Sequence, residues 1–241
     1  MSLDLDIVTK SEKFQKVLDI IKNGKKKFYI FDGIIGAGKT TFITMLETSL
    51  KKTGIKAKAI LEPVDIWNDT GALKYFYSDI EQNCYEFQTF TYITRIDSVI
   101  NTIFDNQDID IYLLERSIWT DRYIFMELLK PKVGNLRMQM YNMWCDLWVY
   151  IMPIIADKWI LLNTSLNESI SRIKMRNRNG ENNINIEYQT ELYKKHIEFY
   201  IKLQKDGKNV IIIENALMDD NFVNNDSIFN KIVEQIFNQN I

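Results

Sequence analysis

A glycine-rich segment near the N-terminus carries the clearest chemical signal in the sequence. Residues 33–40 read G-I-I-G-A-G-K-T and match the G-x-x-x-x-G-K-T pattern of a phosphate-binding loop. In such loops, backbone N–H groups and a helix N-terminus bind anionic phosphates. We expect Lys39 to contact the β- and γ-phosphates of a bound triphosphate and the Thr40 hydroxyl to bind Mg²⁺. The apolar residues 28–31 and the helical sequence after the motif argue against a turn that binds nothing.

Two carboxylates follow apolar, strand-like runs further along the chain. Glu62 comes directly after residues 59–61, and we expect it to act as a general base toward a hydroxyl that attacks the γ-phosphate. The alternative is that Glu62 is a solvated residue at the end of a strand, and this interpretation is slightly favoured when the residue is considered alone. Glu115 would bind Mg²⁺ beside Thr40, directly or through water, and Arg116 would stabilise charge on the transferring phosphoryl group. A capping pair at a strand–helix junction is the alternative for these two residues.

Three arginines, at positions 172, 176 and 178, lie beside an N-R-N-G turn. Arg172 and Arg176 are four residues apart and would share a helix face. Together with Arg178 they suit a lid that closes over phosphates, and a solvated basic helix face is the alternative. The residues expected at the triphosphate are Gly33, Ile34, Ile35, Gly36, Ala37, Gly38, Lys39, Thr40, Thr41, Arg172 and Arg176.

Gln88 and Arg95 are seven residues apart on a predicted helix over residues 82–105, and therefore on one face. Together they could bind the polar edge of a base, because a glutamine side chain offers both a donor and an acceptor. Spacing alone favours the alternative, an exposed surface position. The residues expected to face inward from this helix are Phe87, Phe90, Ile93, Val99 and Phe104. Residues 75–77 could belong to the core or to a sugar and base wall.

Strands that alternate with helices must position these side chains. The pattern predicts strands at 28–31, 56–62, 109–114, 158–162 and 209–213. The predicted helices are 10–22, 40–52, 71–77, 82–105, 117–129, 135–152, 165–178, 187–205 and 226–237. This order predicts a parallel sheet covered on both faces, with ligands at the carboxyl ends of the strands. Positions 33, 62 and 115 all fall at those ends.

Composition narrows the classes of function. Of the 241 residues, 46% are hydrophobic, which is enough for a sizeable core. The formal net charge of −2 argues against non-specific binding to nucleic acid or a membrane surface. The two cysteines, Cys84 and Cys145, lack metal-ligand spacing and fit buried free thiols in a reducing compartment. His196 is the only histidine, which argues against a Ser-His-Asp site and against a histidine-rich metal site. Residues 1–10 resemble no targeting signal, so we expect a cytoplasmic protein, and the apolar run 147–156 is too short to span a bilayer.

Taken together, these segments resemble the deoxyribonucleoside kinase family over about residues 28–200. Besides the phosphate-binding loop, the similar segments are E-P-V-D-I-W at 62–67, F-Q-T-F at 87–90, L-E-R-S-I-W-T-D-R-Y-I-F at 114–125 and R-I-K-M-R-N-R-N-G-E at 172–181. The resemblance implies that Glu62 is the base for a 5′-hydroxyl, that Trp67 lines the nucleoside site and that Gln88 pairs with the base. It also implies that Tyr77 and Glu181 bind the sugar 3′-hydroxyl.

The resemblance also suggests which bases are accepted. Arg95 and Asp121 match an Arg–Asp pair of the deoxycytidine and deoxyguanosine kinases, whereas thymidine-type relatives carry an apolar residue at the position of Arg95. We therefore hypothesise a preference for deoxyadenosine, deoxyguanosine or deoxycytidine over thymidine. Thr91 stands where relatives vary, and Gly180 replaces an acidic residue of the lid.

The sequence thus predicts one α/β P-loop kinase domain over residues 1–241, a three-layer sandwich with a five-stranded parallel sheet and an arginine-rich lid at about 172–186. ATP and Mg²⁺ are the expected cofactors, and the resemblance implies a homodimer through helices 117–129 and 135–152. The expected catalytic residues are Glu62, Lys39, Arg116, Arg176 and Arg178. Two alternatives remain, a thymidylate-type nucleoside monophosphate kinase and an inactive, family-like structural subunit.

Overall fold

The sheet at the centre of the molecule confirms the predicted strand pattern. In the computed structural model, which describes residues 3–176, 184, 186–219 and 222–237, five parallel strands form one sheet in the order β2-β3-β1-β4-β5. The strands are β1 (Lys27–Asp32), β2 (Ala57–Ile60), β3 (Ile111–Glu115), β4 (Lys158–Leu162) and β5 (Val210–Ile213). Phe31 of β1 is in register with Glu115 of β3, so these two strands end at the same level.

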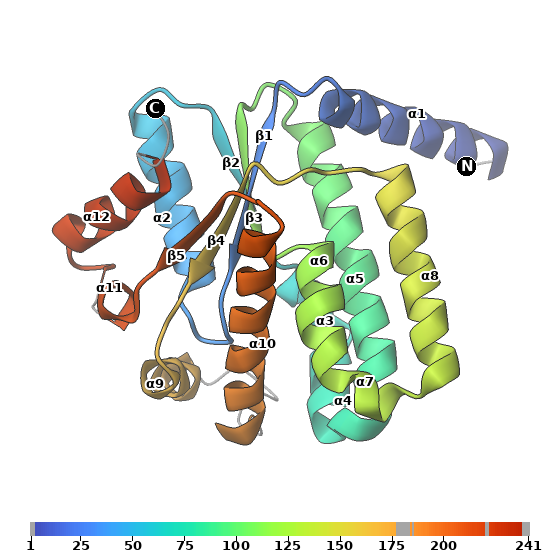
Figure 1. The fold of residues 1–241 in the computed structure, drawn as a ribbon. Coiled ribbons are helices and arrows are strands. Elements are labelled where there is room, and N and C mark those ends of the chain that lie inside the picture. Colours follow the sequence, from blue (N-terminus) through green and yellow to red (C-terminus); the bar gives the residue numbers. More distant parts are fainter. Residues whose placement is uncertain (1–2, 177–183, 185, 220–221, 238–241) are drawn as a thin grey trace.

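Helices cover both faces of the sheet and complete the three layers (Figure 1). On one face lie α2 (Lys39–Lys52), α11 (Asn215–Asp219) and α12 (Asp226–Phe237). The other face carries the long helices α5 (Ile80–Asp105), α8 (Asn135–Ile151) and α10 (Ile186–Lys205). The remaining helices are α1 (Leu3–Lys22), α3 (Val64–Asp69), α4 (Ala72–Ser78), α6 (Ile118–Thr120), the π-helical segment η1 (Asp121–Met126), α7 (Glu127–Val133) and α9 (Leu166–Arg176).

Alternating side chains of each strand enter two separate cores, because successive residues of a strand point to opposite faces. Phe28 and Ile30 of β1 pack on the α5 and α10 side. Tyr29 and Phe31 pack on the other side with Phe42 of α2. The near-continuous apolar strands therefore follow from burial on both faces.

Several details differ from the sequence-based predictions. The first helix begins at Leu3 and not at residue 10, and α11 was not predicted. β2 ends at Ile60, which leaves Glu62 in the connection to α3, a helix that the pattern did not reveal. Residues 117–129, predicted as one helix, fold as α6, η1 and α7, and the helical chain continues to Val133. Ile93 is 46% exposed although it was expected to face inward. At 3.6 residues per turn, it lies about 240° around α5 from the buried Phe87.

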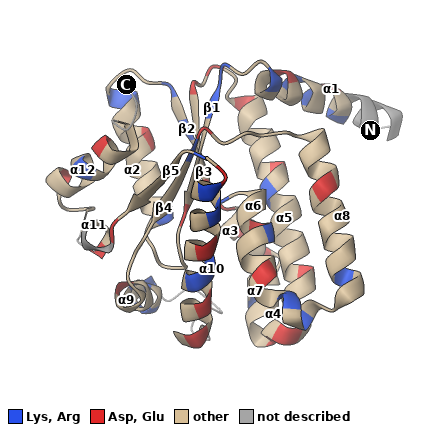
Figure 2. Ribbon diagram, in the orientation of Figure 1, with Lys and Arg blue, Asp and Glu red and all other residues tan. Residues whose placement is uncertain are grey.

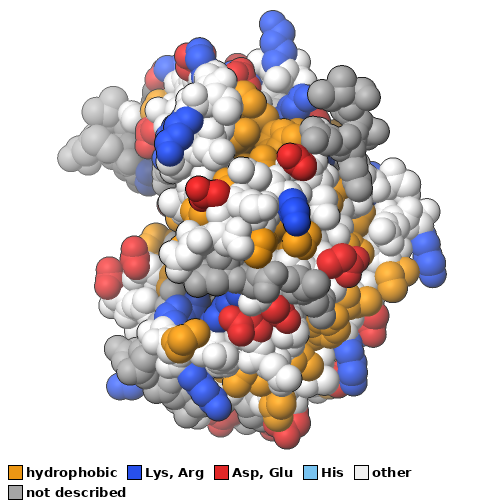
Figure 3. Space-filling view, turned by 90° about the vertical axis from the view of Figure 1, so that its left-hand side faces the viewer, with side chains coloured by type: hydrophobic (Ala, Val, Ile, Leu, Met, Phe, Trp, Pro, Cys, Tyr) orange, Lys and Arg blue, Asp and Glu red, His pale blue; other side chains and the backbone are white. Residues whose placement is uncertain are grey.

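The surface of α8 is apolar along a helical stripe. Leu136, Met143 and Tyr150, which are seven residues apart, are exposed by 71%, 72% and 84%. Met140 and Leu147 lie between them and are also exposed. Figure 2 shows few charged residues along this helix. Figure 3 shows the opposite side of the molecule, which is on the left in Figure 1, and there charged side chains of both signs are interspersed with apolar ones. Among the described residues, no helix combines the length and the apolar character that crossing a bilayer requires.

Candidate active site

A single cleft of about 340 Å³ at the carboxyl ends of the central strands brings most of the predicted site residues together. One end is formed by the phosphate-binding loop and the start of α2, and the other by α3, α4 and α5. The lining residues from the predicted set are Ile35, Gly36, Gly38, Lys39, Thr40, Thr41, Glu62, Trp67, Tyr77, Gln88, Arg95, Glu115, Arg116, Asp121 and Arg176. A volume of this size suits a small-molecule ligand.

The backbone of the phosphate-binding loop requires glycine where it turns most tightly. Gly36 has φ +79°, and a Cβ atom there would lie 2.5 Å from the carbonyl oxygen of Ser169 in α9. Gly38, with φ +85°, stands at the N-cap of α2. Within the described residues, this cap has no side-chain hydrogen bond and the first turn of α2 has no acidic residue. The positive end of the helix dipole is thus available to an anion.

Lys39 is buried at the base of this loop. Its Nζ donates to the carbonyl oxygens of Gly33 and Ile34, at 3.2 and 3.1 Å. Burial and the charge of Arg116 lower the pKa of Lys39 to about 8, although the carboxylates of Glu115 and Glu62 act in the opposite direction. An anionic ligand beside this ammonium group would oppose the cost of burial.

Thr40 and Glu115, the two residues predicted to bind Mg²⁺, are in direct contact. The Thr40 hydroxyl donates to both carboxylate oxygens of Glu115, at 2.8 and 3.0 Å. Burial and the neighbouring charge of Glu62 raise the pKa of Glu115. The carboxylate and hydroxyl oxygens of this pair are the donors that Mg²⁺ prefers. The described residues contain no group of three His, Cys, Asp or Glu side chains suited to a metal, so such an ion would take further ligands from phosphates and water.

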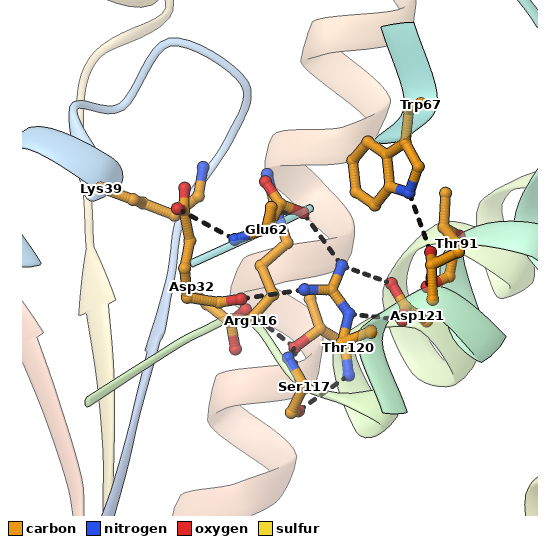
Figure 4. A network of polar contacts seen from close by, with 12 residues as sticks. Asp32, Lys39, Glu62, Trp67, Thr91, Arg116, Ser117, Thr120 and Asp121 are labelled. Atoms are coloured by element: carbon orange, nitrogen blue, oxygen red, sulfur yellow. Dashed lines mark hydrogen bonds and ion pairs between the residues drawn. The ribbon is translucent and has the colours of Figure 1, made fainter. Parts of the chain in front are cut away.

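Glu62 lies between the phosphate-binding loop and a pair of buried arginines (Figure 4). Its Oε1 accepts from Nη2 of Arg95 at 2.9 Å and forms an ion pair with Nε of Arg116 at 3.1 Å. Burial alone would raise the pKa of Glu62, but the charges of Arg116, Arg95 and Lys39 outweigh it and lower the pKa to about 2. The carboxylate is therefore ionised at neutral pH.

Arg95 forms the Arg–Asp pair that the resemblance implied, and it makes further contacts. Its Nε and Nη2 donate to the two oxygens of Asp121, at 2.8 and 3.2 Å. Its Nη1 donates to the carbonyl oxygen of Glu115 at 2.9 Å. The buried positions of Gln88 and Arg95, 2% and 4% exposed, contradict the surface alternative. The contact of Arg95 with Glu62 was not predicted, because no sequence spacing encodes it.

Aromatic rings and Gln88 form the other end of the cleft. Phe76 stacks on Phe87 with ring centres 4.4 Å apart, and the Trp67 indole meets Phe87 edge to face. The indole N–H donates to Thr94 at 2.9 Å, which fixes the ring. The buried Oε1 of Gln88 has no hydrogen-bond partner within the described part of the chain. An unsatisfied buried acceptor of this kind suits a ligand with a donor group.

Some predicted residues lie elsewhere. Arg172 is not among the cleft-lining residues, and its guanidinium bonds the carbonyl oxygens of Ala37 and Met218 behind the loop. Arg178 and Glu181 lie outside the described residues, as does most of the predicted lid at 172–186. Sequence reasoning missed the cleft-lining Tyr188, for which no motif or spacing signal was available.

Comparisons with known proteins identify the family. The deoxynucleoside kinase family model matches residues 30–241. A probable deoxycytidine kinase of fowlpox virus is 27% identical over 208 residues, which cover 86% of this chain and 85% of the viral protein. Human deoxycytidine kinase is 26% identical over 191 residues, 68% of this chain and 72% of that protein. The mitochondrial thymidine kinase 2 of Macaca fascicularis is 30% identical over 183 residues, 74% of this chain and 66% of that protein. The chain belongs to the deoxynucleoside kinase family, a family of phosphate-transferring enzymes of nucleotide salvage.

Proposed function

We propose that this chain transfers the γ-phosphate of ATP to the 5′-hydroxyl of a deoxyribonucleoside. One observation carries the proposal: the ionised carboxylate of Glu62 lies in the cleft that joins the phosphate-binding loop to the aromatic end. A hydroxyl bound at the aromatic end would approach a phosphate at the loop past this carboxylate. The residues that line that end, with Gln88 as the polar group among aromatic rings, suit a flat base.

In the proposed reaction, the 5′-oxygen forms a bond to the γ-phosphorus as the bond to the β–γ bridging oxygen breaks. The hydroxyl proton passes to the carboxylate of Glu62. Lys39, Arg116 and Arg176 line the cleft and would stabilise the charge on the transferring group. Mg²⁺ held at Thr40 and Glu115 would neutralise phosphate charge. Arg178 in the lid and Glu181 at the sugar 3′-hydroxyl, with Tyr77, stay predictions from the resemblance.

The charge near the base favours particular nucleosides. Asp121 presents a buried carboxylate to this end of the cleft, and a carboxylate accepts hydrogen bonds but donates none when ionised. Cytosine, adenine and guanine each carry an exocyclic amino group, and thymine carries none. We therefore infer a preference for deoxycytidine or the purine deoxynucleosides over thymidine. The relatives include kinases named for both choices, so the preference is a proposal about this chain.

Two rival functions receive less support from the site. A nucleoside monophosphate would place a second anion near Glu62, whose neighbouring arginine Arg95 already pairs with Asp121. A non-catalytic subunit would have no need for Lys39, Glu62 and Arg116 to share one cleft. We expect a cytoplasmic location on sequence grounds alone, and the names of some relatives specify mitochondria.

The first prediction concerns the acceptor. Purified chain, ATP and Mg²⁺ should phosphorylate at least one of deoxycytidine, deoxyadenosine and deoxyguanosine with a higher kcat/KM than thymidine. The corresponding 5′-monophosphates should be poor acceptors, because the site suits an uncharged sugar. A radiolabelled phosphate-transfer assay with the four deoxynucleosides and their four 5′-monophosphates measures both the base preference and the choice of acceptor. Faster transfer to thymidine than to the other three would contradict the base preference, and faster transfer to a monophosphate would contradict the reaction.

A matched variant tests the source of the preference. Replacing the pair together, as R95M/D121A, removes both partners of this ion pair at once, and Glu62 keeps its ion pair with Arg116. The loss of the Arg95–Glu62 contact affects all nucleosides, so the ratio between two of them is the quantity to measure. The ratio of kcat/KM for thymidine to that for deoxycytidine should rise by roughly tenfold or more, since a hydrogen bond to a charged group contributes ~1.5–3 kcal/mol. An unchanged ratio would remove this pair as the determinant.

The second prediction concerns the proton acceptor. Glu62→Gln and Glu62→Ala should lower kcat by about 10²–10⁴-fold, the usual contribution of a positioned base. Calorimetry should show nucleoside binding within a few-fold of the unsubstituted chain, because Trp67 and Gln88 remain in place. Glu198→Gln, at an exposed glutamate of α10, serves as the control. Turnover near normal in both Glu62 variants would eliminate the residue as base.

The third prediction uses the pKa of Lys39, which burial and Arg116 lower to about 8. The ammonium group is charged below this pH and neutral above it, so kcat/KM for ATP should fall about tenfold per pH unit on the alkaline side. Bound phosphates favour the charged form, so the limb in kcat should lie at higher pH. Lys39→Arg should abolish the limb at a lower overall rate. A profile that is flat to pH 10 in the unsubstituted chain would disprove this role of the lysine.

The fourth prediction concerns assembly. The apolar stripe on α8 supports the homodimer that the resemblance implied, because exposed contiguous apolar surface marks interaction sites. Light scattering should give twice the chain mass of 28.6 kDa. Met143→Lys with Leu147→Lys should give a monomer, whereas Ile201→Lys, at an exposed apolar residue of α10, should not. A monomeric unsubstituted chain at micromolar concentration would refute the dimer.

A further inference from the structure

His196, the only histidine of the chain, has no role in the reaction proposed above. It lies on α10 and is 1% exposed. Its Nε2 is 3.2 Å from Nη1 of Arg116. We propose that His196 is a positioning residue, which accepts a hydrogen bond from Arg116 and so holds the guanidinium at the cleft. The positioning itself is a structural claim, and its effect on turnover rests on the proposed kinase function.

The second ring nitrogen of His196 determines the tautomer. Nδ1 lies 2.8 Å from the carbonyl oxygen of Leu192, one helical turn earlier. Because a carbonyl oxygen only accepts hydrogen bonds, Nδ1 must carry the proton of this contact. The neutral ring then has a lone pair at Nε2, directed at a guanidinium that only donates. The two contacts are therefore compatible with one protonation state.

The surroundings keep this ring neutral. Burial and the charge of Arg116 lower the pKa of His196 well below its usual value. A protonated ring would place an N–H group and a positive charge against the guanidinium, and both would be unfavourable. The ring of Phe125 meets His196 edge to face, with centres 6.3 Å apart, and closes one side of the pair.

The backbone and the side chain of Arg116 are both closely surrounded. Arg116 directly follows β3 and has a φ of +64°, and among the described residues no other non-glycine residue has a positive φ. Its backbone N–H donates to the carbonyl oxygen of Phe31. The guanidinium lies over the ring of Phe125 at 4.6 Å from the ring centre. His196 contacts Nη1 and Glu62 contacts Nε. Among the described residues Nε has no hydrogen-bond partner and is held only by the ion pair, so the contact at Nη1 and the ring face of Phe125 chiefly define the orientation of the planar guanidinium.

This orientation has a chemical consequence. A cation stabilises a transferring phosphoryl group most when it is already aimed at the developing charge, because no reorganisation is then needed during the reaction. Without His196, the guanidinium would retain its ion pair with Glu62 and could turn about it. The missing contact should therefore reduce kcat more than nucleoside or ATP binding.

The hydrogen bond can be tested without any enzymatic assay. Since the chain has one histidine, ¹⁵N-histidine labelling gives a single side-chain spectrum. We expect a protonated Nδ1 and an unprotonated Nε2 throughout pH 5.5–9, with an Nε2 shift that changes in Arg116→Met. A protonated Nε2, a ring that titrates with an ordinary histidine pKa, or an Nε2 shift unaffected by Arg116→Met would overturn the positioning claim.

Two substitutions test the effect on turnover. His196→Leu removes the acceptor at similar volume, and kcat should fall by roughly tenfold or more with KM values changed by only a few-fold. His196→Gln places an amide oxygen within reach of Nη1 and should restore most of the loss. Thermal unfolding of both variants separates stability from rate. Equal loss of kcat in both, unchanged kcat in His196→Leu, or a loss confined to KM would reject the role.

The two proposals fail in different ways. If the unsubstituted chain phosphorylates no deoxynucleoside, the proposed function is wrong, and the ¹⁵N spectra still decide whether His196 orients Arg116. If the chain is active but the spectra or the variants give the contrary results, only the role of His196 is wrong.

Discussion

The carboxylate of Glu62 shares one oxygen between two buried arginines, and the rest of the cleft is built around this contact. Removing such charges from water costs several kcal/mol for each ion unless partners compensate it. The partners come from four separate parts of the chain: the connection after β2, α5, the end of β3 and η1. The sheet and its helical layer must therefore be in register before the charges can pair. Loss of one partner would leave another charge buried and unpaired.

The charged groups around Glu62 and Glu115 shift the pKa values of these two carboxylates in opposite directions. Glu62 faces Arg116, Arg95 and Lys39, whose charges outweigh its burial and lower its pKa. Glu115 is more deeply enclosed and adjoins Glu62, so burial and a like charge raise its pKa. Two carboxylates in one cleft thus acquire different properties from their neighbours rather than from their chemistry. Glu62 is ionised and can accept a proton. A cation such as Mg²⁺ beside Glu115 would stabilise its ionised form.

The architecture was predictable from the sequence, because the strands are short apolar runs and the loop motif fixes one strand and one helix. The positions of Glu62 and Glu115 followed from parallel topology, since the carboxyl ends of such strands meet at one edge. The burial of Gln88 and Arg95 was not decidable from the helix pattern, because polar residues on a helix face are usually exposed. Only the resemblance to the deoxyribonucleoside kinase family favoured a place for Gln88 and Arg95 in the nucleoside site. The contacts Arg95–Glu62 and Arg116–His196 join residues 33 and 80 positions apart, and no local pattern records them.

Arg95 joins the end of the cleft expected to hold the base to the expected proton acceptor. Its Nη2 contacts both Asp121, at the end expected to hold the base, and Glu62, the expected proton acceptor. A substitution that changes the charge around the base must therefore also change the charge around the acceptor. With an apolar residue at this position, Glu62 would keep only Arg116 and Lys39 among the three cations that lower its pKa. Relatives that carry such a residue would need a compensating change near Glu62 to keep the carboxylate equally ionised. In the proposed reaction, selectivity for the base and the rate of phosphate transfer would therefore be coupled through one guanidinium group.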